Sequence, residues 1–211
     1  MPGCLRRIVF LSALLTAAAA GATGIAVQVQ DATGKVLPDT VIYIEPEGAA
    51  AAVAAAKPAT ALIEQKGLKF LPLVTVVQTG ALINFPNNDK VRHHIYSFSA
   101  AHKFDQKLYS GQAASPQVFD KAGTVVLGCN IHDKMIAYIK VVDTPYFAKT
   151  DGAGAARIEL PAAGKYVVKA WHFNTVGGAT LEQALTVKAG DLATAIFKLP
   201  MKPPVVGDPG T

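Results

Sequence analysis

Apolar and polar residues alternate over short stretches along most of this chain, and turn-forming residues separate the stretches. Alternation with a period of two places every second side chain on one face, which is typical of a half-buried β-strand. Many short strands at close spacing favour an antiparallel β-sandwich or barrel. The pattern therefore predicts an all-β protein with two early strands (25–29 and 41–44), six central strands (73–77, 82–85, 93–98, 117–119, 124–129 and 136–142) and four late strands (157–160, 166–171, 180–187 and 193–199).

The first residues have the features of an export signal. Arg6 and Arg7 precede an apolar run from Ile8 to Leu15, and small residues follow as far as Ala22. This order of charged, apolar and small residues is typical of a secretory signal peptide, and the run is short for a membrane core of ~30 Å. We therefore expect residues 1–22 to be a signal peptide, and the mature protein to be periplasmic without a transmembrane segment.

Export changes both the charge balance and the number of thiols. The full chain has 20 basic and 15 acidic residues, and loss of Arg6 and Arg7 leaves 18 against 15, a net charge of +3. These charges are scattered and form no basic patch interleaved with aromatic residues, which argues against nucleic acid as a partner. Cys4 leaves with the signal, so Cys129 is the one remaining thiol and has no intramolecular disulfide partner.

The stretch from Cys129 to Met135 carries the clearest chemical signal in the chain. It presents a thiolate, an imidazole and a thioether at Cys129, His132 and Met135, with the spacing C-x2-H-x2-M. These are soft or borderline ligands, and two histidines, one cysteine and a weak axial methionine make an electron-transfer copper site. The second imidazole is available from His93 or His94, in a predicted strand.

Other interpretations of Cys129 account for fewer of these residues. A single cysteine is more often a buried small hydrophobe, but the spacing of His132 and Met135 favours a metal. Zinc sites use cysteine, histidine and carboxylates and give the thioether no role. A catalytic thiol needs a well-placed base and an oxyanion turn, and no glycine-rich turn of that kind accompanies Cys129. We therefore predict one mononuclear copper site and no enzymatic activity.

The metal-binding stretch and its approach resemble the cupredoxins, the blue-copper proteins. The C-x2-H-x2-M spacing is similar to that of amicyanin, and the approach from Phe119 through Gly123 to Cys129 resembles the strand that delivers the cysteine in this family. Residues 80–89, followed by the histidine pair, resemble the segment that delivers the first ligand. Residues 109–147 look like plastocyanin-like proteins labelled methylamine utilisation proteins. The resemblance implies a cupredoxin Greek-key sandwich over residues 62–143.

The resemblance also implies a role for each residue of the site. Cys129 supplies a covalent thiolate bond, His132 is an equatorial ligand, and Met135 is the weak axial ligand. In the family, the histidine of this loop conducts the electron through the protein surface, which here matches His132. Ile131 and Ile136 then form an apolar patch beside it where redox partners dock.

His93 and His94 are both candidates for the upstream ligand, and two lines of reasoning favour different residues. Strand alternation groups His94 with Tyr96 on the more apolar face, which favours His94 as the inward-facing residue. The family pattern is His-Asn-Val, which instead matches His93 as the ligand and Ile95 as the valine. We predict that His93 is the ligand, and that His94 and Asn130 are neighbours that support the ligands or replace one of them.

The flanking segments resemble a carboxypeptidase regulatory-like, transthyretin-type β-sandwich. The similar stretches are residues 27–34, 150–154 and 160–166, together with Trp171, which we expect to pack in this sandwich. Two strands at the start of the chain cannot bury a face alone and need the late strands as partners. This predicts first strands at 24–47, an alanine-rich linker at 48–61, the cupredoxin at 62–143, the rest of the flanking sandwich at 144–199, and a disordered tail at 200–211.

Three functional hypotheses follow from these features. The first is a periplasmic type 1 copper protein that transfers single electrons between redox proteins, such as a cytochrome or a dehydrogenase. The second is a copper-binding or copper-delivery protein that does not cycle between redox states. The third is a structural or binding β-sandwich with a degenerate copper site. We take the first as the leading hypothesis.

Overall fold

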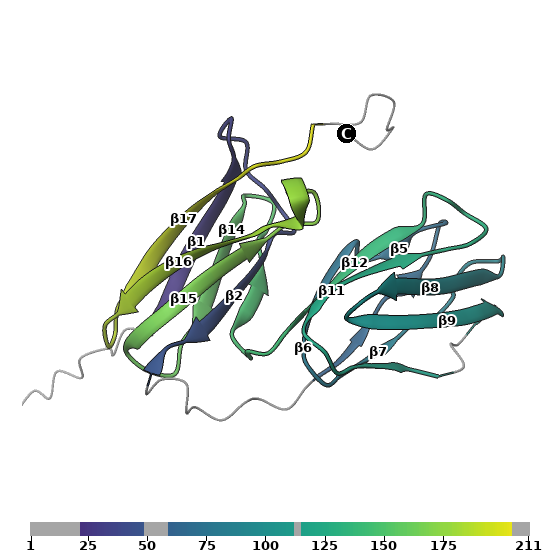
Figure 1. The fold of residues 1–211 in the computed structure, drawn as a ribbon, viewed down its shortest axis with the longest axis horizontal. Helices are drawn as coiled ribbons and strands as arrows, with labels where there is room; N and C mark the ends of the chain where they lie inside the picture. The colour runs from purple at the N-terminus through teal and green to yellow at the C-terminus, as the bar shows by residue number, and fades with distance from the viewer. Residues whose placement is uncertain (1–21, 49–58, 112–114, 204–211) are drawn as a thin grey trace, which may run out of the picture.

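Two pairs of β-sheets contain most of the chain in the computed structural model, which describes residues 22–48, 59–111 and 115–203 (Figure 1). The prediction of an all-β fold is confirmed. One pair is built from both ends of the described chain, and we call it the terminal sandwich. The other pair is built from the middle of the chain, and we call it the central sandwich.

The terminal sandwich joins segments that are more than 100 residues apart in the sequence. One sheet has the order β14-β1-β17, and the other has the order β13-β2-β15-β16. β1 runs antiparallel to β14 and parallel to β17, whereas β2 runs antiparallel to β13 and β15. The elements are β1 (Gly24–Asp31), β2 (Val41–Pro46), β13 (Phe147–Lys149), β14 (Ala155–Glu159), β15 (Gly164–Trp171), the short 3-10 helix η2 (Val176–Gly178), β16 (Thr180–Val187) and β17 (Leu192–Leu199).

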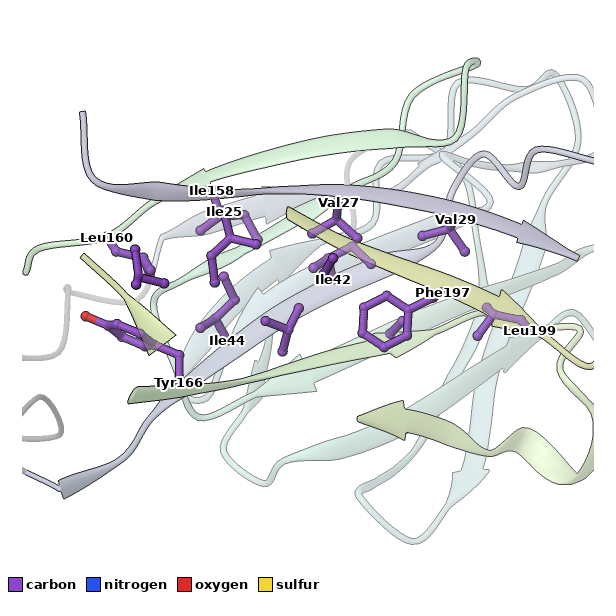
Figure 2. Packing of buried hydrophobic residues seen from close by; sticks show 14 of the residues in the cluster. Ile25, Val27, Val29, Ile42, Ile44, Ile158, Leu160, Tyr166, Phe197 and Leu199 are labelled. Atoms are coloured by element: carbon purple, nitrogen blue, oxygen red, sulfur yellow. The ribbon is translucent and has the colours of Figure 1, made fainter. Parts of the chain in front are cut away.

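Alternating side chains from both sheets fill the core of the terminal sandwich (Figure 2). On β1, Ile25 and Val29 are fully buried, and on β2 the same is true of Ile42 and Ile44. Each buried aliphatic side chain of this kind contributes about 1.5–3 kcal/mol relative to its exposed state. The early strands therefore obtain their buried face from the late strands, as the sequence pattern requires.

The central sandwich pairs a sheet of order β10-β7-β3 with a sheet of order β6-β12-β11-β8-β9, and a small hairpin, β4-β5, precedes β6. Its core contains the fully buried rings of Phe85 and Phe119 together with Ile83, Ile95 and Leu127. The elements are β3 (Thr60–Leu62), β4 (Glu64–Gln65), β5 (Phe70–Leu71), β6 (Val74–Gln78), β7 (Ala81–Asn84), β8 (His93–Ser99), β9 (His102–Tyr109), β10 (Gln117–Phe119), β11 (Gly123–Gly128) and β12 (Ile136–Val142).

The two sandwiches pack against one another through a third apolar cluster. Val41 and Tyr43 of β2 and Trp171 of β15 meet Val74 of β6 and Val142 of β12. Trp171 was expected inside the flanking sandwich, but its side chain lies between the two sandwiches instead. The reason is alternation: Val168 and Ala170 face the core of the terminal sandwich, so Trp171 faces the opposite side.

A buried lysine lies at this contact between the sandwiches. The Nζ atom of Lys140 is 5.6 Å from the ring centroid of Tyr43 and 5.3 Å from that of Trp171. Burial lowers the pKa of Lys140, and the nearby charge of Lys169 lowers it further. Cation–π contacts with two rings compensate part of the cost of burying this amine.

Several sequence predictions fall outside the described residues or at their edges. The signal peptide lies almost entirely outside them, as do residues 49–58 of the predicted linker. Thr60 and Ala61, assigned to that linker, lie in β3. Near the end of the chain, Lys202 N donates a hydrogen bond to Asn174 O at 2.9 Å, so part of the predicted tail is attached to the terminal sandwich. Among the described residues, no helix has the length and apolar character needed to cross a membrane.

Candidate metal centre

The end of strand β11 delivers Cys129 to one end of the central sandwich. β11 pairs antiparallel with β12, and its last residue, Gly128, lies opposite Tyr96 of β8. A Cβ atom at Gly128 would come within 2.7 Å of the Tyr96 ring, so a larger residue at this position would displace the Tyr96 side chain. The Cys129 side chain is 4% exposed and belongs to the core cluster of the central sandwich.

A tight turn after Cys129 brings His132 back towards the thiol. Met135 N donates a hydrogen bond to His132 O at 2.9 Å, which closes the turn before β12 begins. The His132 Nδ1 atom lies 3.8 Å from the Cys129 Sγ atom, and the His132 side chain is partly exposed. Met135 is fully buried in the same core cluster as Cys129. The loop therefore presents one buried thiol and one imidazole that reaches towards solvent.

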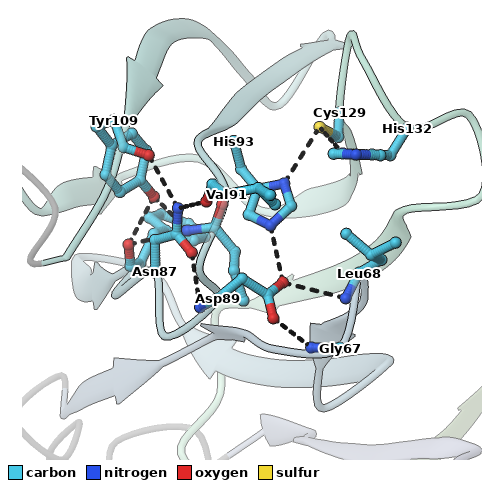
Figure 3. Close-up of polar contacts among 11 residues, drawn as sticks. Gly67, Leu68, Asn87, Asp89, Val91, His93, Tyr109, Cys129 and His132 are labelled. Atoms are coloured by element: carbon cyan, nitrogen blue, oxygen red, sulfur yellow. Dashed lines mark hydrogen bonds and ion pairs between the residues drawn. The ribbon is translucent and has the colours of Figure 1, made fainter.

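His93, the first residue of β8, completes a group of three donors. It is fully buried, and its Nδ1 atom lies 3.9 Å from the Cys129 Sγ atom (Figure 3). The rings of His93 and His132 are 5.0 Å apart, centre to centre. The ligand atoms of His93, Cys129 and His132 all lie within 4.8 Å of one another. The structure thus brings together three of the four predicted metal ligands at one point.

Asp89 fixes the orientation of the His93 ring. The Nε2 atom of His93 is 2.8 Å from Asp89 Oδ2, and the two Asp89 oxygens also accept hydrogen bonds from Gly67 N at 2.6 Å and Leu68 N at 3.1 Å (Figure 3). Desolvation raises the pKa of Asp89, but the hydrogen bonds from His93 and the two backbone amides outweigh it, so the pKa lies below its usual value. An ionised carboxylate only accepts hydrogen bonds, so a neutral His93 carries its proton on Nε2 and turns the free Nδ1 lone pair towards Cys129.

Asn87 holds the segment between β7 and β8 in place. Its side-chain amide donates to Val91 O and Tyr109 O, both at 2.9 Å, and its Oδ1 accepts from Asp89 N at 3.0 Å. Asn87 is 2% exposed, so these bonds satisfy a buried polar group. Asn87 and Asp89 lie in the segment 80–89 that resembles the approach to the first ligand, but no role at the site was predicted for them. A carboxylate four residues before a ligand histidine is the signal that could have identified Asp89.

A second buried network lies beneath the same segment. The Tyr109 hydroxyl donates to Phe85 O at 2.6 Å and accepts from Gln65 Nε2 at 2.5 Å. Tyr109 lies opposite His93 across the β8-β9 pair. Burial raises the pKa of Tyr109 to about 12, and the charge of Cys129 contributes to the increase. The phenol therefore stays neutral and keeps both hydrogen bonds over the ordinary pH range.

The remaining predicted site residues lie around this group rather than in it. His94 is partly exposed, and its Nε2 atom contacts the carboxylate of Asp105 on β9. Its ring lies against Tyr96, away from the three donors. Asn130 and the two isoleucines of the predicted docking patch, Ile131 and Ile136, are exposed.

The donor set fits a soft or borderline metal ion. Two ligand atoms that are each ~2.0–2.3 Å from one ion lie roughly 3.5–4 Å apart. The two measured sulfur–nitrogen separations, 3.8 and 3.9 Å, fall in this range. One thiolate with two imidazoles, one of them held by a carboxylate, is a donor set that both copper and zinc accept. Met135, which is buried in the same core cluster as Cys129, offers a thioether, and this favours copper.

Comparisons with known proteins give similarities to part of the chain only. No family model matches the sequence, and no curated protein matches it significantly. Similar solved structures include a novel purple cupredoxin from Nitrosopumilus maritimus (21% identity, 39% of this chain and 99% of that chain, TM-score 0.35) and amicyanin from Paracoccus versutus (19%, 47% and 98%, 0.36). A copper-containing nitrite reductase from Thermus scotoductus SA-01 is also similar (22%, 46% and 25%, 0.38). Each likeness covers less than half of this chain, so any conclusion about chemistry depends on the side chains themselves.

Proposed function

We propose that this protein is an exported carrier of single electrons that holds one copper ion between His93, Cys129 and His132, with Met135 as a weak axial ligand. The observation that carries this proposal is the convergence of one thiol sulfur and two imidazole Nδ1 atoms at the end of the central sandwich. A bound copper ion supplies one-electron chemistry by alternating between its +1 and +2 states. The role of the protein is to hold the ligands in one arrangement through both states.

Three features of the structure support a rigid ligand arrangement. Cys129 follows a packed strand and His93 begins another, and positions on packed strands are more precise than positions on loops. The His93 ring is held by Asp89, whose own position depends on two backbone amides and on Asn87. Ligands held in this way by packed strands and hydrogen bonds have little freedom to rearrange when the electron arrives or leaves.

His132 is proposed as the exit and entry point for the electron. It is the partly exposed member of the three donors. The exposed Ile131 directly precedes it, and the exposed Ile136 follows four residues later. Apolar side chains around an exposed ligand suit transient docking of another redox protein, a cytochrome or a dehydrogenase. We propose that the protein works in the periplasm as a carrier, and that it catalyses no reaction itself.

The proposal for the whole chain keeps the predicted division into two sandwiches. Strand pairing of β1 with β14 and β17, and of β2 with β13 and β15, supports a transthyretin-type sandwich assembled from residues 24–47 and 144–199. The cupredoxin of residues 62–143 lies between these two segments in the sequence. The core clusters of the two sandwiches share no residue, which supports treating them as two units.

Voltammetry of the copper-loaded mature protein tests the carrier proposal against copper delivery. A carrier gives a reversible one-electron couple, and the protein keeps its copper through repeated cycles. Release of the ion to a chelator after each reduction would instead identify a delivery protein and contradict the proposal.

Two matched variants test whether His93 or His94 is the upstream ligand. His93→Ala removes a buried donor of the group, whereas His94→Ala removes a ring that contacts Asp105. We expect copper titration of His93→Ala to lose the intense thiolate-to-copper absorption and His94→Ala to retain it. Loss of the band in His94→Ala alone would show that His93 is not the ligand.

A further inference from the structure

Three turns meet at the end of the central sandwich where His132 is exposed. The first is the turn 66–69 of the β4-β5 hairpin, whose Gly67 and Leu68 amides donate to Asp89. The second is the segment 88–92, which contains Asp89 and leads into His93 (Figure 3). The third consists of residues 130–136, which are the loop after Cys129 and the first residue of β12. Strand β5, which follows the first turn, packs beside β12. We call these residues, 66–69, 88–92 and 130–136, the three-turn surface.

Large aliphatic side chains are exposed on each of the three turns. Leu68 is 47% exposed, Val91 46%, Ile131 49% and Ile136 42%. Turns are usually occupied by small or polar residues, so aliphatic side chains on all three are unusual. Exposed apolar residues gathered near a functional group mark an interaction site more often than isolated ones do.

Basic residues lie on the same three turns as these apolar residues. All five are exposed: Lys66, Lys69, Lys90, Arg92 and Lys134. Within the described part of the chain, none of the five takes part in a salt bridge. Lysines of the terminal sandwich differ in this respect, since Lys149 pairs with Asp39 and Lys169 pairs with two glutamates.

The acidic residues of the same region offset this positive charge only in part. The Asp89 carboxylate accepts hydrogen bonds from His93 and from two backbone amides. Glu64, just before the first turn, accepts a hydrogen bond from the side chain of Asn88 at 2.7 Å. Asp133 is exposed on the metal loop. With five basic residues against these three, the region has a net positive charge, and two of its three carboxylates are engaged within the protein.

We propose that the three-turn surface is the docking face for an acidic redox protein, one that presents carboxylates around an apolar centre. This assignment rests on the proposed electron-carrier function, because it places the partner against the exposed edge of His132. Opposite charges around the rim attract and orient the partner, and they act mainly on the association rate. The aliphatic centre then brings the two proteins close enough for electron transfer without a permanent interface.

A redox-inert anion tests the charge of this face independently of copper. Hexacyanochromate(III) is paramagnetic and broadens the NMR signals of nearby amides, so it can be added to the metal-free, nitrogen-15-labelled protein. We expect selective broadening at Gly67, Leu68, Val91 and Ile131 at low ionic strength, and its loss near 1 M salt, where the Debye length is ~3 Å. Broadening that is stronger on the terminal sandwich than on these amides would overturn the proposal, whatever the state of the copper site.

A pair of charge-reversal variants then tests the effect on electron transfer. Lys66→Glu with Lys69→Glu changes the three-turn surface, and Lys188→Glu with Lys198→Glu makes the same change in net charge on exposed positions of the terminal sandwich. For oxidation of the copper-loaded protein by hexacyanoferrate(III), we expect the first variant to be slower by about tenfold at low salt and the second to stay close to the unaltered protein. Equal rates in the two variants would overturn the proposal. If neither the variants nor the unaltered protein transfers electrons while the NMR result holds, the carrier function fails and the basic docking face for an anionic partner stands.

Discussion

The two sandwiches have similar apolar cores but differ in where they bury polar groups. In the terminal sandwich the buried polar residues at the turns include threonines, such as Thr40 and Thr150, which join loop backbones. In the central sandwich an asparagine, a glutamine and a histidine are buried near one end, and they hold the segment that leads into β8. The candidate metal centre is therefore part of a buried network of amide, carboxylate and imidazole groups, whereas the buried threonines of the terminal sandwich only connect neighbouring loop backbones.

The largest predicted effect comes from removing one buried aromatic ring from the core of each sandwich. Phe85 and Phe197 are both buried, and a Phe→Ala change at such positions costs about 3–5 kcal/mol of unfolding free energy. We expect both variants to be destabilised in urea titrations. Only Phe85→Ala should also weaken copper binding in competition with a chelator, because the Phe85 ring packs in the core cluster that contains Cys129 and Met135. An equal loss of copper affinity in Phe197→Ala would mean that the site depends on the whole molecule.

A smaller effect is expected from changing the carboxylate that holds His93. Asp89→Asn keeps the shape but places an amide group where two backbone amides and a ring nitrogen now donate, so at least one donor loses its acceptor. We expect copper affinity to fall by about 10- to 100-fold, as for other groups that orient a metal ligand, with a shift of the optical band.

The matched control for that variant is the carboxylate beside the other histidine. Asp105→Asn changes the partner of His94, which lies outside the group of three donors. We expect little change in its copper affinity or spectrum. Equal effects of Asp89→Asn and Asp105→Asn would show that the contact between Asp89 and His93 has no special role.

The smallest predicted effect is a loss of stability at acidic pH that is caused by His172 of the terminal sandwich. Burial lowers the pKa of His172, so the unfolded chain takes up a proton more readily than the folded chain. Stability from this residue is therefore complete above pH ~6.5 and decreases as the pH falls below it, by at most ~1.4 kcal/mol per pH unit. His172→Asn keeps an acceptor for the Asn174 amide and removes the titration. Urea titrations at pH 7.5 and 5.5 should show a smaller acid loss in this variant, and an unchanged loss would exclude His172 as a cause.

Local sequence patterns predict most strands of the fold and the two donors, Cys129 and His132, that lie in one loop. Alternation predicted most strands of both sandwiches, because a buried face requires an apolar residue at every second position. The strand β9 was missed, since this edge strand is half exposed and carries charged residues at positions such as Lys103 and Asp105. The spacing of Cys129 and His132 identified the loop donors, because both depend on one short turn.

The features that were missed depend on contacts between distant segments. Asp89 acts through His93, but its orientation is set by the hairpin amides of Gly67 and Leu68, about 20 residues earlier. The position of Trp171 between the sandwiches depends on a strand face that meets Val74 and Val142 of the central sandwich. No local pattern of hydrophobic residues contains this information, since alternation fixes the face of a strand but not its partner.

The most direct test of the copper centre is the optical and EPR spectrum of the copper-reconstituted mature protein beside its Cys129→Ser variant. We expect an intense visible charge-transfer band from a thiolate bound to Cu(II) in the unaltered protein, an EPR signal with small copper hyperfine splitting, and the loss of both features when the sulfur is replaced by oxygen. A colourless protein that takes up no copper, or a spectrum that is the same in both proteins, would contradict this expectation.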